Sequence, residues 1–329
     1  MFHVKHFGTI DGTSNIHLRG VATSEAGRKH SGLRPRIEDF KRAVMTRTGE
    51  KTAFVFAGGG SLGAIQVGML RVLLATGVQP DFVIGSSAGA INAGYFAGAP
   101  NEEGVERLAN IWSGLRGRDV FPFTFTSALG LLRHPGHFTD SNGLRRLIET
   151  NLPYKLLEDA VIPVHVTATD VEGVAVLLSK GPALDAIMAS AAIPGIFPPV
   201  RIDGRSLMDG AIAANTPIKV AADLGASRIV VLPTGYACAL KEPPKKAIAR
   251  ALHAITLLIE WQLIRDLERL TGEIHISIVP TLCPLDVSPY DFSASHYLIQ
   301  RAADSTRKWV DGGGLSRQSS PQELQAHSH

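Results

Sequence analysis

The stretch TAFVFAGGGSLGAIQVGMLRVLLATGVQPDFVIGSSAGAINAGYFAG, residues 52–98, decides the fold. It holds two successive units, each made of a short apolar run, a glycine-rich turn and an apolar segment with helical spacing. Residues 52–56 have strand character, and the helix after the first turn is predicted to stop at Gly77. Residues 82–84 repeat the plan and lead through GSSAG into a small-residue helix over 88–97. Strands alternating with helices predict a largely parallel sheet.

The second turn has the form G-x-S-x-G, with Ser87 between Gly85 and Gly89. A serine at a sharp strand-to-helix corner exposes its hydroxyl, and the flanking glycines make room for backbone and substrate. A serine before a helix is also a common N-cap, and the pentapeptide alone is a weak signal. The strand–turn–helix setting favours a nucleophile elbow at Ser87 over a simple cap.

The first turn, GGGSLG, begins with Gly58, Gly59 and Gly60 and also fits the dinucleotide fingerprint G-x-G-x-x-G. That fingerprint expects an acidic residue at the end of the second strand, whereas Asp81 precedes that strand. A phosphate-binding loop with Gly-Lys-Ser/Thr is absent from the sequence. Three glycines before a helix are better explained as backbone N–H groups that bind a developing oxyanion.

A serine nucleophile needs a base, and none of the twelve histidines follows a late strand as a hydrolase histidine would. Asp209 is the alternative, because it ends a predicted strand, precedes glycine and lies near Asn215 in a turn. Asp170 competes for the same role. Asp203 is better explained as the turn of a hairpin, and an ordinary turn is also the plain explanation for Asp209.

Composition limits the classes of function. The chain has 329 residues, 45% of them hydrophobic, and a net charge of +3. Lys and Arg outnumber Asp and Glu by 9 to 5 in residues 1–50 and are balanced, 24 against 25, in the remainder. The body therefore lacks the basic surface expected for nucleic-acid binding, although a weakly basic arm could touch anionic lipid.

The sequence shows no apolar run of the roughly 18 residues expected of a membrane span and no apolar signal core. Two cysteines, Cys238 and Cys283, are too few and too far apart for a zinc motif or a disulfide framework. We therefore expect a soluble, cytoplasmic protein in a reducing compartment, with peripheral contact to membranes as an option.

The remaining elements alternate along the chain. Predicted helices cover 101–115, 141–150, 182–192, 218–224, 245–270 and 293–310, and predicted strands cover 163–169, 174–178, a hairpin over 199–208, 228–233 and 273–279. The fold class expected is α/β, with a largely parallel central sheet between helices on both faces.

The chain divides into three segments. Residues 1–48 are polar and lack a sustained period, so we expect a mostly disordered arm, with Met45 as an alternative start of the native protein. Residues 49–312 form the catalytic domain, and 313–329 a flexible tail. Within the domain, residues 117–140 carry four phenylalanines without a period, which favours a lid over an apolar substrate slightly more than core filling.

The motifs GGGSLG, GSSAG and DGAIAANTP, in this order and spacing, closely resemble those of the patatin-like phospholipases. The resemblance covers about residues 51–312, and ATD at 168–170 and SAAIPGIFPP at 190–199 add to it. It implies a three-layer α/β/α fold and a Ser–Asp dyad that hydrolyses acyl esters of lipids, at a membrane or micelle surface, without a histidine, a metal or a cofactor.

Carried onto this chain, the resemblance assigns Ser87 as nucleophile and Asp209 as base. It assigns the oxyanion hole to the N–H groups of Gly58, Gly59 and Gly60, the elbow to Gly85 and Gly89, and support to Gly210 and Asn215. Two positions depart from the family's pattern. Leu62 stands where many members have Lys or Arg, and Ala211 stands where many have glycine.

Two alternatives use the same residues differently. An acyltransferase would pass the acyl group to another alcohol, and a catalytically silent protein would only bind lipid. The serine, the glycine turn and the aspartate together argue against the silent protein. Head group, chain length and oligomeric state are not encoded in these motifs.

Overall fold

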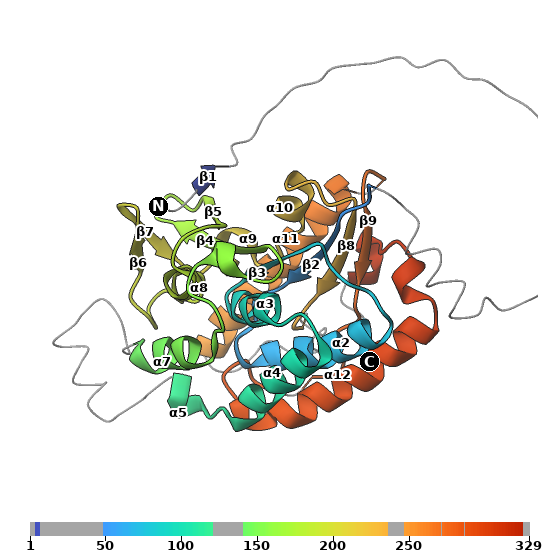
Figure 1. Cartoon of the computed structure of the whole chain (residues 1–329), viewed down its shortest axis with the longest axis horizontal. Helices are drawn as coiled ribbons and strands as arrows, with labels where there is room; N and C mark the ends of the chain where they lie inside the picture. The colour runs from blue at the N-terminus through green and yellow to red at the C-terminus, as the bar shows by residue number, and fades with distance from the viewer. Residues whose placement is uncertain are drawn as a thin grey trace, which may run out of the picture. The chain divides into compact units, whose positions relative to one another are not determined.

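The structure is a computed structural model, and it describes residues 4–6, 49–120, 141–235, 247–270, 272–285 and 287–324 (Figure 1). The predicted arm lies outside the described residues except for 4–6, and so does the predicted lid except for its first four residues. Residues 1–6 and 50–329 belong to one compact unit, which contains every described helix and strand.

A nine-stranded sheet forms the centre of this unit, in the order β1-β5-β4-β3-β2-β8-β9, with β6 and β7 attached as a hairpin to β4. The five strands from β4 to β9 in that order run parallel, whereas β1, β5 and β7 are antiparallel to their neighbours. The strands are β1 Val4–His6, β2 Thr52–Phe56, β3 Phe82–Ser86, β4 Val164–Asp170, β5 Ala175–Leu178, β6 Val200–Ile202, β7 Arg205–Met208, β8 Arg228–Leu232 and β9 His275–Ile278.

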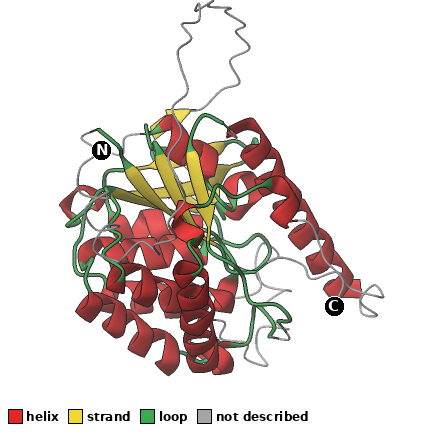
Figure 2. Ribbon diagram, turned by 90° about the vertical axis from the view of Figure 1, so that its right-hand side faces the viewer, coloured by secondary structure: helices red, strands yellow, loops and turns green. Residues whose placement is uncertain are grey.

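Helices cover both faces of the sheet, as Figure 2 shows, so the predicted three-layer α/β/α fold is confirmed. The helices α2, α3, α4 and α12 pack together on one face, and α9, α10 and α11 lie on the other. The described helices are α2 Gly63–Ala75, α3 Ala88–Gly98, α4 Glu102–Gly114, α5 Gly117–Val120, α7 Asn142–Asn151, α8 Ala183–Ser190, α9 Ala211–Ala214, α10 Ile218–Asp223, α11 Ala247–Leu270 and α12 Ser295–Asp311. The described 3₁₀ turns are η1 Gly60–Leu62, η2 Leu157–Asp159, η3 Phe292–Ala294, η4 Gly314–Ser316 and η5 Pro321–Leu324.

The core lies where the central strands meet α3. Phe54 and Phe56 of β2 are fully buried, and the ring of each lies 6.3 Å from the ring of Phe96 in α3. Strands buried on both faces read as continuous apolar runs, which is why β2 and β8 were recognisable in the sequence. This packing holds the carboxyl ends of β2 and β3, from which the two glycine-rich turns emerge.

The segment after α12 differs from the predicted flexible tail. Residues 315–319 lie along the edge strand β9, where the N–H of Ser319 donates to the carbonyl of Ile276 at 2.8 Å and Gln318 accepts from the N–H of Ile276 at 2.9 Å. Leu315 and Leu324 are buried. The physical reason is that an edge strand presents unpaired backbone groups, which a following polar segment can satisfy.

One other local expectation also needs correction. Cys283, after β9, is disulfide-bonded, and the only other cysteine of the chain, Cys238, lies outside the described residues. A disulfide bond at Cys283 was not expected from the number and spacing of the cysteines.

Candidate active site

Ser87 sits at a sharp corner between β3 and α3. Its backbone has φ 54° and ψ −125°, a left-handed conformation that a non-glycine residue adopts only when its surroundings impose it. The flanking glycines show what imposes it. A Cβ on Gly85 would lie 2.3 Å from the carbonyl oxygen of Gly89, and a Cβ on Gly89 would lie 2.3 Å from that of Phe56. The elbow is thus packed against β2 with no space for side chains.

The hydroxyl of Ser87 donates a hydrogen bond to Oδ2 of Asp209 at 2.7 Å. Asp209 follows β7, and β7 pairs with β4, the neighbour of β3, so the sheet brings the two residues together. The other carboxylate oxygen of Asp209 accepts from the N–H of Ala211 at 2.8 Å, which fixes the orientation of the carboxylate. Both side chains are almost completely buried.

Burial raises the pKa of Asp209 from its ordinary value near 3.8 to about 6, because the apolar surroundings disfavour the charged form. The hydrogen bonds from Ser87 and Ala211 act in the opposite direction, since they stabilise the carboxylate. A carboxylate with this pKa is a stronger base than an exposed aspartate and is still ionised near neutral pH.

The three glycines of the first turn do not serve the same purpose. The N–H of Gly58 donates to the carbonyl of Asn215 at 3.1 Å, so it is not available to a substrate, in contrast to the expectation. The N–H groups of Gly59 and Gly60 make no hydrogen bond to the part of the chain that the structure describes. Gly60 lines the same cavity as Ser87, and its φ of +59° is one that glycine adopts readily.

The turn carrying these glycines is fixed from several sides. A Cβ on Gly58 would lie 3.1 Å from Cβ of Ser87, and one on Gly59 would lie 2.2 Å from Oγ1 of Thr234. A Cβ on Gly60 would lie 2.5 Å from the carbonyl oxygen of Pro289. Only glycine fits this close approach of backbone to nucleophile, and the two free amides are therefore held in place near Ser87.

Asn215 and Gly210 lie in the loop that carries Asp209, and both contact neighbouring elements. The N–H of Asn215 donates to Oε1 of Gln262 in α11 at 3.2 Å, and Nε2 of Gln262 donates to the carbonyl of Ala213 at 2.5 Å. A Cβ on Gly210 would lie 2.2 Å from the carbonyl oxygen of Thr167, so the loop lies directly against β4. Gln262 was not singled out from the sequence, because a glutamine on a long helix carries no motif.

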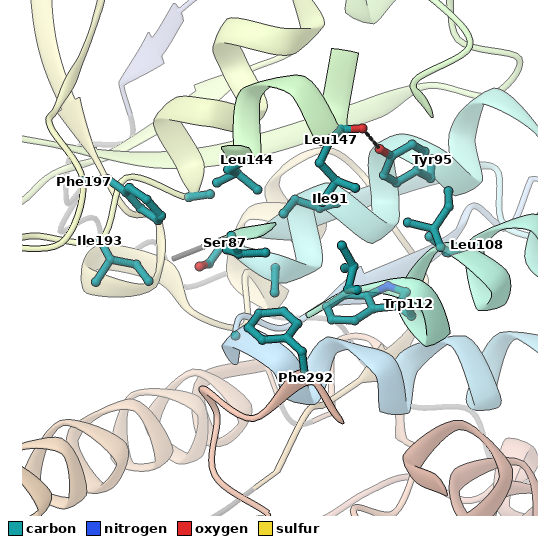
Figure 3. A pocket seen from close by; sticks show the side chains of 16 residues that line it. Ser87, Ile91, Tyr95, Leu108, Trp112, Leu144, Leu147, Ile193, Phe197 and Phe292 are labelled. Carbon is teal, nitrogen blue, oxygen red and sulfur yellow. Dashed lines mark hydrogen bonds between the residues drawn. The ribbon is translucent and has the colours of Figure 1, made fainter. Parts of the chain in front are cut away.

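An apolar cavity opens beside Ser87 between α3, α4, α7 and the end of α8 (Figure 3). Its polar members are Ser87 and Tyr95, and the hydroxyl of Tyr95 is bonded to the carbonyl of Leu147 at 3.0 Å. The cavity is lined by Gly60, Ser87, Ala88, Ile91, Tyr95, Leu108, Ile111, Trp112, Leu115, Val120, Leu144, Leu147, Ala191, Ile193, Phe197 and Phe292. We expected the apolar contacts to come from residues 117–140, whereas α4 and α7 supply much of this lining.

The competing acidic residues have structural roles. Asp170 accepts from the N–H groups of Glu172 and Val174 and so closes the turn between β4 and β5. Asp203, with φ 48°, forms the hairpin turn between β6 and β7, as predicted. Asp81 accepts from the N–H of Thr52 at 2.7 Å, where β2 begins, at the opposite end of that strand from the glycine turn.

Other candidates for metal or base chemistry lie elsewhere. Nδ1 of His165 is 2.8 Å from Oγ of Ser179, and burial lowers the pKa of His165 to about 4. Among the described residues, no three His, Cys, Asp or Glu side chains come close enough to hold a metal ion. Ser87 and Asp209 thus remain the pair that the fold brings into direct contact beside a cavity.

Comparison with known proteins agrees with this fold. The family model for patatin-like phospholipases matches residues 54–222, and the chain belongs to that family. The chain is 30% identical over 209 residues to patatin-like phospholipase domain-containing protein ZK370.4 of Caenorhabditis elegans, and 30% identical over 203 residues to patatin-like phospholipase domain-containing protein 7 of Rattus norvegicus. Each match covers 61% of this chain and 15% of the relative.

Among solved structures, the chain is similar to human GIVD cytosolic phospholipase A2 in complex with methyl γ-linolenyl fluorophosphonate. That match has a TM-score of 0.47 and 13% identity, and it covers 88% of this chain and 62% of the other. VipD from Legionella pneumophila matches with a TM-score of 0.43 and 13% identity over 80% of this chain and 67% of the other.

Proposed function

We propose that the protein is a lipid acyl hydrolase that uses Ser87 as nucleophile and Asp209 as base. The observation that carries the proposal is the 2.7 Å hydrogen bond from Ser87 to Asp209 at the wall of an apolar cavity. A nucleophilic hydroxyl bonded to a basic group with a fixed orientation is the arrangement that serine-dependent acyl transfer needs. Membership of the patatin-like phospholipase family supports the substrate class.

In the first step, Asp209 takes the proton of the Ser87 hydroxyl while Oγ forms a bond to the ester carbonyl carbon. The electron pair of the C=O double bond moves to its oxygen, and the N–H groups of Gly59 and Gly60 stabilise the resulting oxyanion. The C–O bond to the leaving alcohol then breaks, and that alcohol takes the proton from Asp209. An acyl group remains on Ser87.

In the second step, Asp209 takes a proton from water, and the water oxygen attacks the acyl carbonyl carbon. The bond between that carbon and Oγ of Ser87 breaks, the proton returns to Oγ, and the fatty acid leaves. The same carboxylate acts in both steps, so its raised pKa serves both. A pKa of about 6 keeps Asp209 ionised near neutral pH and improves it as a proton acceptor.

The cavity would hold the acyl chain. Its lining is almost entirely apolar, and its empty space, which includes the part open to solvent, is about 560 Å³. Ile91 lies one helical turn beyond Ser87 along α3, and Tyr95 lies two turns beyond, about 12 Å away at 1.5 Å per residue. A chain esterified to Ser87 would therefore run along α3 against apolar side chains.

We also propose that the substrate is taken from a lipid surface. Ile212 in α9, three residues after Asp209, is exposed, and so are Leu258 and Trp261 in α11. The neighbouring Gln262 binds the loop that carries Asp209, so these apolar side chains lie close to the site. Tryptophan is favoured at the interface between membrane and water. In the described part of the chain, no helix is long and apolar enough to cross a membrane.

Variants at the two residues test the proposal. Ser87→Ala and Asp209→Asn should each abolish hydrolysis of a short p-nitrophenyl ester, while circular dichroism shows an unchanged fold. Asp203→Asn is the matched control, because Asp203 is an exposed turn residue in a conformation that asparagine tolerates, and it should keep full activity. Ester hydrolysis by a folded Ser87→Ala variant would contradict the proposed mechanism. Added alcohol acceptors, followed by product analysis, separate hydrolysis from acyl transfer.

A further inference from the structure

Ser190 lies at the end of α8 and is completely buried, yet it is not part of the dyad. Its hydroxyl donates to the carbonyl of Thr167 in β4 at 2.6 Å and accepts from the backbone N–H of Ser87 at 2.8 Å. The hydroxyl thus joins the elbow to the strand beside it, and both of its hydrogen bonds are short.

The same residue also holds the loop of the base. The carbonyl of Ser190 accepts from the N–H of Gly210 at 3.0 Å, and the carbonyl of Ala192 accepts from the N–H of Asp209 at 3.0 Å. One end of α8 therefore binds the nucleophile through a side chain and the base through the backbone. Asp209 and Ser87 come from distant parts of the chain, and Ser190 is in hydrogen-bond contact with both segments.

The hydrogen bond from the N–H of Ser87 to Oγ of Ser190 satisfies a backbone donor that would otherwise be buried without a partner. The N–H of Ser87 is buried at a backbone corner with φ 54°, where no helical carbonyl can accept it. A buried N–H without a partner is costly, and local rotation of the elbow is the route by which the chain would relieve it. This bond also means that the N–H of Ser87 is not a donor to the oxyanion, which leaves that role to other amides.

We propose that Ser190 is a positioning residue that sets the contact between Ser87 and Asp209, an inference that rests on the proposed dyad. Removing its hydroxyl leaves Ser87 free to rotate and lengthens the bond from Oγ to the carboxylate. Small misplacements of reacting groups lower the rate of the chemical step much more than they lower binding.

Ser190→Ala should lower kcat roughly 10- to 100-fold with little change in KM, because the acyl cavity is untouched. The acid limb of the pH profile supplies a second readout. The hydrogen bond from Ser87 lowers the pKa of Asp209. If Ser190→Ala weakens that hydrogen bond, the pKa of Asp209 rises and the acid limb of kcat/KM moves to higher pH. A purely structural role for Ser190 would lower the amount of folded enzyme and leave that limb in place.

Ser86→Ala is the matched control. Ser86 is next to the nucleophile and equally buried, but its hydroxyl has no hydrogen-bond partner in the described part of the chain. The same atom is removed in both variants, and Ser86→Ala should keep wild-type kcat and the wild-type pH profile. Should Ser190→Ala fail to fold, Ser190→Cys carries the same test, because its sulfur is a weak acceptor and kcat should be intermediate.

The outcomes separate this inference from the proposed function. Wild-type kcat and an unmoved acid limb in folded Ser190→Ala, or in Ser190→Cys, overturn the positioning role, even when Ser87→Ala is inactive. Equal losses in Ser190→Ala and Ser86→Ala also overturn it, because they indicate a general effect of removing a buried hydroxyl. Hydrolytic activity that is retained in the folded Ser87→Ala variant contradicts the proposed function itself.

Discussion

The hydroxyl of Ser87 lies 2.7 Å from Oδ2 of Asp209, although 122 positions separate the two residues in the sequence. The contact exists because β3, which ends at Ser86, lies beside β4, and β4 pairs at its end with β7, which precedes Asp209. Two strand pairings therefore assemble the candidate catalytic pair. No third titratable side chain is hydrogen-bonded to either residue in the described part of the chain.

The dyad predicts a pH dependence with one defined sign. Asp209 must be ionised to accept a proton, and burial raises its pKa to about 6. As pH falls through 6 the carboxyl becomes protonated, so kcat/KM for a neutral ester should fall by about tenfold per pH unit below that value. A rate profile over pH 4–8 measures this limb. A limb near pH 4, the ordinary range of aspartate, would contradict the burial argument.

The cavity predicts a chain-length effect. Ile91→Trp places a large ring one helical turn from Ser87 and should shorten the space for an acyl chain. We expect kcat/KM for a long-chain p-nitrophenyl ester to fall roughly tenfold or more, with the acetyl ester much less affected. Ile91→Val is the control, since it leaves the space open. Equal losses for long and short esters in Ile91→Trp would argue that the chain binds elsewhere.

The elbow predicts a stability difference between two inactive variants. At φ 54° and ψ −125° glycine is unstrained, whereas alanine keeps the strain that serine bears. Both variants lose the bond to Asp209, so the comparison isolates the backbone. The free energy of unfolding of Ser87→Gly, measured in urea, should be about 1–2 kcal/mol higher than that of Ser87→Ala. A less stable Ser87→Gly would mean that the corner is not strained.

Much of this architecture could be predicted because it rests on local patterns. Buried parallel strands appear as apolar runs, and the glycine-rich turns after β2 and β3 are recognisable from residue type alone. Ser87 and Asp209 were predicted from such turns together with the family resemblance. The positions of Gly85 and Gly89 follow from the same logic, and the backbone contacts now explain why no larger residue fits.

The rest depends on contacts between distant segments. The N–H of Gly58 is taken by Asn215, and nothing in GGGSLG indicates which of its amides stay free. Ser190 sits in an alanine-rich helix, where a small polar residue first suggests close packing. The cavity joins α3, α4 and α7, whose apolar faces look like ordinary core faces in the sequence, and the edge pairing of Ser319 with Ile276 has no sequence signal.

The exposed apolar side chains near the site predict lipid binding. The double variant Leu258→Gln and Trp261→Ala should bind mixed phosphatidylcholine and phosphatidylglycerol vesicles at least roughly tenfold more weakly, because two large apolar groups are lost from the interface. Hydrolysis of a soluble ester should be unchanged. Tyr297→Ala is the control, since Tyr297 is equally exposed but lies in α12, on the opposite face of the sheet. Unchanged vesicle binding in the double variant would place the contact surface elsewhere.

The most direct measurement of the central claim is the site and rate of covalent capture by a long-chain alkyl fluorophosphonate. Mass spectrometry of the intact protein and of its peptides should show one adduct, on Ser87. The adduct should be absent from Ser87→Ala, form much more slowly in Asp209→Asn, and form at the wild-type rate in Asp203→Asn. An adduct on another residue, or an undiminished rate in Asp209→Asn, would contradict the Ser87–Asp209 dyad.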